Sequence, residues 1–171
     1  MSRSVSAGFA LLLAAMAPVA CTGEPDEAQR DAGQTQAATD PDAPAGISVS
    51  EARMTLPAVS GNPGALYFTI ANSGEADLTI ASASITGVGM ATFHQTVNAG
   101  GQARMDSMAH VPLPAGEEVA LAPGGMHVMA MDLDDSFAIG GRTEATLTFD
   151  NGDKVSFPVE IVAPGSTGEG T

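Results

Sequence analysis

Nine short runs of alternating or β-branched residues, separated almost everywhere by turn-forming residues, constrain the fold of this chain most strongly. Alternation with a period of two is typical of half-buried strands, and Gly, Pro, Asn and Asp in the gaps favour tight turns. No stretch between the runs has a helical period. The pattern predicts an all-β antiparallel sandwich or barrel of about eight to nine strands. The runs cover residues 47–58, 65–72, 77–85, 88–97, 103–108, 117–122, 126–133, 143–150 and 154–162.

The first twenty residues have the order of a secretory signal peptide. Arg3 precedes an apolar run from Ala7 to Met16, and small residues follow up to Ala20. The apolar run is too short for a permanent membrane-spanning helix. We therefore predict that residues 1–20 are a signal peptide and that the protein is exported.

Cys21, the only cysteine, follows this segment directly. Its position resembles that of the lipid-attachment cysteine of bacterial lipoproteins, which would anchor the chain to a membrane without spanning it. The alternative is ordinary cleavage and a free exported thiol. We favour lipidation of Cys21, and Thr22 in the next position favours the outer membrane over the inner one.

The segments that flank the strand region lack the residues needed for a core. Residues 21–46 contain no aromatic or large aliphatic side chain, so they predict a disordered acidic tether. Residues 164–171 predict a disordered tail. The whole chain carries a formal net charge of −14, which repels nucleic acid and excludes that class of partner. One domain is thus predicted, at residues 47–163.

Histidine and methionine cluster in one part of that domain. Six of the nine methionines and all three histidines lie between Met90 and Met131. In the predicted hairpin around "NAGG", a turn centred between Ala99 and Gly100 places His94 directly opposite Met105. Opposed side chains are about 4.5 to 5.5 Å apart at Cβ, so this pair is close enough to share one metal ion.

A second His and Met pair lies in the predicted strand 126–133. His127, Met129 and Met131 alternate there and therefore share one face of the strand. If the two pairs converge, they form a site with two imidazoles and two thioethers. Thioether sulfur is soft and uncharged, so it favours monovalent copper over hard or divalent ions. The predicted domain lacks the cysteine that a blue-copper electron-transfer site requires.

The spacing of these four residues also resembles that of a known family. The array His94-x10-Met105-x21-His127-x-Met129 matches the motif of the periplasmic copper chaperones called the PCuAC family. The flanking segments "GALYFTIANSGEADLTIASAS" and "LTFDNGDKVSFPVEIV" are similar as well. The resemblance covers residues 47–163 and implies a cupredoxin-like Greek-key β-sandwich that holds one Cu(I). The tail "APGSTGEGT" lacks the histidines and methionines with which some members bind a second ion.

What the resemblance implies about function is a monomeric periplasmic carrier that delivers Cu(I) to cytochrome c oxidase assembly. The acceptor would be the copper domain of the oxidase or a periplasmic thiol copper chaperone. Two alternatives remain: a copper-sequestering or resistance protein with no dedicated acceptor, and a β-sandwich interaction module without metal. An enzyme is not expected, because the domain has no nucleophile elbow, cysteine nucleophile or carboxylate–histidine dyad.

The remaining methionines and polar residues of the region have simpler interpretations. Methionine in a strand is usually flexible core packing, and an acidic turn without the glycine and closing glutamate of an EF-hand is usually solvated. These are the expected roles: core packing for Met54, Met90 and Met126; packing in the core or behind the ligands for Met131; a rim or exposed position for Met108; a hydrogen-bonded structural role for His110; and a solvated turn for Asp132, Asp134 and Asp135.

Overall fold

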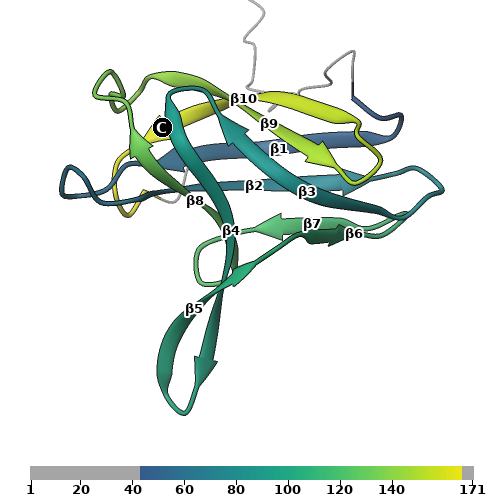
Figure 1. Cartoon of the computed structure of the whole chain (residues 1–171), viewed down its shortest axis with the longest axis horizontal. Helices are drawn as coiled ribbons and strands as arrows, with labels where there is room; N and C mark the ends of the chain where they lie inside the picture. Colours follow the sequence, from purple (N-terminus) through teal and green to yellow (C-terminus); the bar gives the residue numbers. More distant parts are fainter. Residues whose placement is uncertain (1–42, 167–171) are drawn as a thin grey trace, which may run out of the picture. The chain divides into compact units, whose positions relative to one another are not determined.

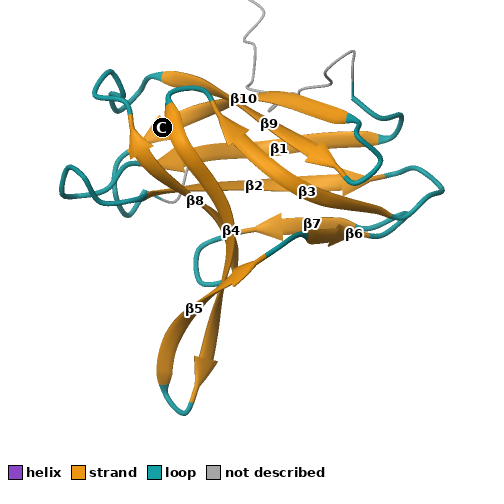
Figure 2. Cartoon of the chain, in the orientation of Figure 1, coloured by secondary structure: helices purple, strands orange, loops and turns teal. Residues whose placement is uncertain are grey.

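The computed structural model describes residues 43–166, and all regular secondary structure in that range is β-strand (Figure 2). Within that range, no helix exists that is long and apolar enough to cross a membrane. The strands are β1 (Ile47–Thr55), β2 (Gly64–Asn72), β3 (Leu78–Ile85), β4 (Val88–Ala99), β5 (Gln102–Met108), β6 (Val111–Leu113), β7 (Glu118–Leu121), β8 (Met126–Leu133), β9 (Arg142–Phe149) and β10 (Lys154–Val162).

The strands pair in the order β5-β4-β8-β2-β1-β10-β9-β3-β6, and β7 pairs with β2 beside β8. The sheet folds over on itself, because β3 and β4, near opposite ends of this order, contact each other (Figure 1). The predicted all-β sandwich is therefore confirmed, and every predicted run forms a strand. Two details differ from the prediction. A short tenth strand, β6, is present, and the pairing of β1 with β10 is parallel.

One continuous hydrophobic core fills the sandwich. Alternation is clearest in β2, where every second side chain is buried. Phe68 of β2 and Phe157 of β10 meet in the core, with ring centroids 5.3 Å apart and planes tilted by 52°. Such tilted aromatic pairs add stabilisation beyond the apolar area they bury. The core positions of β4 and β8 include Phe93, Val128 and Ala130, so the opposite faces of these two strands point outward.

The predicted signal peptide, Cys21 and most of the predicted tether lie outside the described residues. The last four residues of that tether, 43–46, are described, and they contact the sandwich. Ala43 packs against the core, and the carbonyl oxygen of Gly46 accepts a hydrogen bond of 2.8 Å from the backbone N–H of Ser73. Of the predicted tail, only residues 164–166 are described.

The hairpin formed by β4 and β5 extends away from the other strands (Figures 1 and 2). Its tip is Gly100-Gly101, with φ angles of 61° and 81°. Positive φ at both central positions suits a two-residue hairpin turn whose twist matches that of the strands. β5 is an edge strand whose pairing partner is β4, so the outer part of the hairpin is a two-stranded ribbon.

Candidate metal centre

The strands β5, β4 and β8 lie side by side and bring the four predicted ligands to one outer face. His94 of β4 is directly opposite His127 of β8, and Thr92 is directly opposite Met129. On the other side of β4, Thr96 is opposite Met105 of β5. Residues directly opposite, or two positions apart on one strand, point to the same face. The two histidines and two methionines therefore lie on one face of three adjacent strands.

The predicted register of the hairpin was wrong. The turn is centred on Gly100-Gly101, and so His94 is opposite Ser107 and not Met105. Moving the turn by one residue moves each partner by two positions, which preserves the face. Met105 is thus a diagonal neighbour of His94, and diagonal neighbours are within reach of long side chains. The signal for the correct register was available, because glycine tolerates the positive φ that alanine at position 99 would not.

His127 is the most deeply placed of the four residues, with only 5% of its surface exposed. Its Nδ1 is 3.2 Å from the carbonyl oxygen of Gly125. An Nδ1–H that donates to this carbonyl leaves the lone pair on Nε2, which is the usual way to orient a ligating imidazole. The ring of Tyr67 lies 6.2 Å from that of His127, between centroids, and the guanidinium of Arg53 lies 5.6 Å above the Tyr67 ring.

His94 faces His127 with ring centroids 6.1 Å apart and planes 28° from parallel. Its Nε2 is 3.0 Å from the Thr92 hydroxyl oxygen, whereas its Nδ1 is buried and has no hydrogen-bond partner among the described residues. Desolvation by burial, and then the charge of His127, lower the pKa of His94 below its usual value. A neutral imidazole with one nitrogen unsatisfied is well suited to bind a metal ion.

The two thioethers differ in exposure. Met129 is half-buried, whereas 60% of the Met105 surface is exposed on the projecting hairpin. Large apolar side chains gain free energy by burial, so an exposed methionine diagonal to His94 favours a role for its sulfur. The resulting donor set is two neutral imidazoles and two thioethers. This set fits a soft monovalent cation and offers no charge to balance a divalent one.

The other methionines occupy three kinds of position. Met54 is fully buried, as predicted, and Met126 is half-buried and packs against the core. Met108 is half-buried opposite Phe93 and packs against the core, so it is not an exposed contact, and its partial burial agrees with the predicted rim position. The core prediction for Met90 is wrong, because 53% of its surface is exposed and it lies on the face of His94. Met131 is half-buried on that same face.

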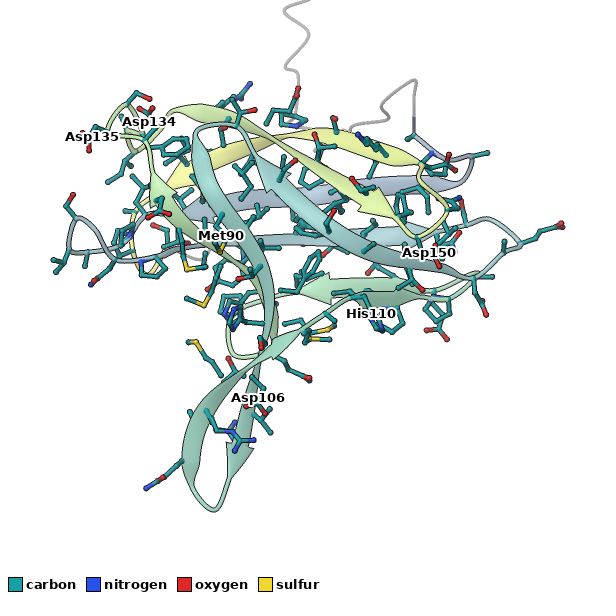
Figure 3. The ribbon with its side chains drawn as sticks, viewed as in Figure 1. Met90, Asp106, His110, Asp134, Asp135 and Asp150 are labelled. Carbon is teal, nitrogen blue, oxygen red and sulfur yellow. The ribbon has the colours of Figure 1, made fainter. Side chains whose placement is uncertain are left out.

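His110 and the acidic turn lie outside the metal centre. His110 is exposed between β5 and β6, so the expectation of a buried structural histidine is wrong (Figure 3). Asp132, Asp134 and Asp135 are exposed, as expected for a solvated turn. The Asp134 carboxylate accepts a hydrogen bond of 2.8 Å from the backbone N–H of Ser136, which lowers the pKa of Asp134.

The acidic turn borders an open cavity of about 370 Å³, which is also lined by Leu56, Asn62 and Phe137. Across residues 43–166, no three His, Cys, Asp or Glu side chains gather as they would around a metal ion. The candidate metal centre among these residues is the methionine-containing set around His94 and His127.

The fold is similar to that of several solved structures, among them structures titled as PCuAC domains. The structure titled "Copper-bound PCuAC domain from PmoF2" matches with a TM-score of 0.59 and 22% identity, over 70% of this chain and 94% of that chain. "Solution structure of CuI-DR1885 from Deinococcus Radiodurans" matches with a TM-score of 0.56 and 22% identity, over 67% of this chain and 77% of that chain. At these identities the likeness shows the fold, which is cupredoxin-like as the resemblance implied.

The sequence itself identifies the family. Residues 47–161 match the model of the family described as "Putative lipoprotein LpqE-like", and the chain belongs to that family. A relative from Leifsonia xyli subsp. xyli, "Putative lipoprotein Lxx21020", is 29% identical over 118 residues, which are 67% of this chain and 70% of the relative. The predicted lipoprotein character agrees with both descriptions.

Proposed function

We propose that this protein is an exported, lipid-anchored carrier of Cu(I) that binds one ion through His94, Met105, His127 and Met129. The observation that carries the proposal is the direct opposition of His94 and His127, with a thioether beside each on the same face. Two solved domains of the same fold are described as copper-bound, which supports copper as the ion. The lipid on Cys21 would hold the carrier at the periplasmic face of the outer membrane.

The donor set explains how the ion could be both held and released. Four neutral ligands leave the single positive charge of Cu(I) uncompensated, so a thiolate on an acceptor gains Coulomb energy as it binds. Met105 is the most exposed ligand and is therefore displaced first. Stepwise exchange then moves the ion to the acceptor, without a change of oxidation state. A carrier is favoured over an enzyme on this account.

The Met105→Leu variant tests the site. Leucine keeps the volume of methionine and removes the sulfur, so Cu(I) affinity should fall by about 10- to 100-fold, a range that even residues behind metal ligands can produce. Because Met105 is exposed, stability should change by less than about 0.5 kcal/mol. Titration with Cu(I) against a chromophoric competitor measures the affinity, and urea unfolding measures the stability.

Met126→Leu is the matched control for that experiment. Met126 is in β8 next to His127, but it packs toward the core and not on the ligand face. The Met126→Leu variant should bind Cu(I) with the same affinity as the unsubstituted protein. If Met105→Leu binds Cu(I) as tightly as the control, Met105 is not a ligand. If neither protein binds Cu(I) stoichiometrically, the interaction-module alternative is favoured.

Delivery requires a separate test. We expect most of the copper to move when the loaded protein is mixed with an equimolar amount of an apo cytochrome c oxidase copper domain, because paired thiolates bind Cu(I) better than thioethers and imidazoles. Copper is measured on each protein after separation. The control is an acceptor with both cysteines replaced by serine, which should take up none. Copper that stays on this protein would support sequestration without an acceptor.

A further inference from the structure

Met90 and Met131 form a pair that the proposed four-ligand site does not use. They are directly opposite each other on β4 and β8, on the same face as the site. Moving along these two strands, the facing pairs are His94 with His127, Thr92 with Met129, and then Met90 with Met131. Successive pairs on one face are about 6.6 to 6.8 Å apart. Along the strands, Met129 therefore lies between the two histidines and the pair formed by Met90 and Met131.

Packing does not account for this pair. Met90 has 53% of its surface exposed, and neither Met90 nor Met131 belongs to the core or to the residues packed against it. On the reverse side of the same strands, Ala130 and Phe93 are buried at 0% and 4% exposure. Directly opposed side chains are about 4.5 to 5.5 Å apart at Cβ, so both sulfur atoms can reach one ion. Figure 3 labels Met90 on β4.

We propose that Met90 and Met131 form a second Cu(I) site, which shares Met129 with the four-ligand site. Its ligands are all thioethers, so it is soft and neutral and has no imidazole. It therefore binds Cu(I) more weakly than the site that contains His94 and His127. As an ion moves between the two sites, a Cu–S bond to Met90 or Met131 is exchanged for a Cu–N bond to histidine. The ion stays Cu(I), and the total charge does not change.

Negative charges lie near Met131, at the end of β8, and they would attract a cation. Asp132 directly follows Met131 and is exposed, as are Asp134 and Asp135 in the turn beyond it. Asp132 is opposite Gly89, where the absence of a side chain leaves room for it: a Cβ at position 89 would lie 2.8 Å from that of Asp132. Carboxylates grouped at one end of a surface raise the local concentration of cations. The second site thus lies between the acidic turn and the histidines.

The pathway from this site to the histidines rests on the proposed function, but the site itself can be tested alone. The protein is labelled with ¹³C at the methionine methyl groups and titrated anaerobically with Cu(I), and the methyl signals are followed by NMR. We expect the first equivalent to shift Met105 and Met129, and the second to shift Met90 and Met131. The signal of Met54, buried in the core, should stay unchanged. Unshifted signals of Met90 and Met131 at two equivalents would overturn the proposal.

Two variants separate this inference from the main proposal. In His94→Gln with His127→Gln, the signals of Met90 and Met131 should still respond to Cu(I), now at the first equivalent. In Met90→Leu with Met131→Leu, the second equivalent should be lost while the first binds as before. Loading from a weak Cu(I) complex, such as Cu(I) in acetonitrile, should then be slower, with no change in equilibrium affinity of the four-ligand site. If the histidine variant abolishes the response of Met90 and Met131 to Cu(I), they do not form a site of their own.

Discussion

Replacement of His127 by glutamine should lower the affinity for Cu(I) by at least about 100-fold, because even residues behind metal ligands can change affinity by 10- to 100-fold. Glutamine can still donate a hydrogen bond to the carbonyl of Gly125, which accepts from His127 Nδ1 in the native structure. The buried position therefore keeps its polar partner, and the domain should remain folded. Competitive Cu(I) titration gives the affinity, and thermal unfolding of the apo protein checks the fold.

His110→Gln is the control for this variant. His110 is exposed between β5 and β6 and is not part of the site, so its replacement should leave Cu(I) affinity unchanged. Comparing the His127→Gln and His110→Gln variants shows whether a fall in Cu(I) affinity requires loss of His127 or follows from loss of any histidine. Equal affinities of the His127 and His110 variants would contradict the assignment of His127 as a ligand.

Replacement of Phe68 by alanine should have the largest effect on stability. Phe68 is 1% exposed and meets Phe157 in the core. Truncation of a buried phenylalanine costs about 3 to 5 kcal/mol, which is a large part of the 5 to 15 kcal/mol typical of a domain. Because β2 also pairs with β8 at Ala65 and Met129, the loss should weaken the support of the metal site. Urea unfolding of the apo protein measures the change.

Val59→Ala is the matched control, since Val59 is also an apolar residue but is 63% exposed. Its free energy of unfolding should stay within about 0.5 kcal/mol of the native value, as is usual for surface positions. Addition of Cu(I) should partly restore the Phe68 variant, because a ligand that binds only the folded state stabilises it. A loss below about 1 kcal/mol in Phe68→Ala would contradict the central position of this residue in the core, given typical costs of such truncations.

Local patterns in the sequence were sufficient to predict most strands but not all of their pairing. β6 was missed because it is only three residues long and contains Pro112, and proline normally argues against a strand. The parallel pairing of β1 with β10 was also missed. Alternation reports which face of a strand is buried, and it is the same in parallel and antiparallel pairs. Strand direction depends on how the whole sheet closes, which no local pattern contains.

For the candidate site, the sequence predicted which residues share a face of one strand, but not how the strands align with one another. Alternation placed His127 and Met129 on one face, and the structure agrees. The direct opposition of His94 and His127 depends on the alignment of β4 with β8, which are separated by a long stretch of chain. The exposure of Met90 was missed because methionine in a strand usually packs in the core. It became visible only when the outward face of β4 was known.

The β4–β5 ribbon bears on the order in which the ligands of the proposed copper site would dissociate. His94, His127 and Met129 belong to strands held on both sides by neighbours, so their positions are fixed relative to one another. Met105 stands on an edge strand, opposite Thr96, which directly follows the last residue of β4 paired with β8. A ribbon of two strands bends more readily than a sheet supported by a core. If the proposed site is correct, three of its donors are rigid and one is hinged, and a partner strand that pairs with the free edge of β5 would move Met105 and thereby control release of the ion.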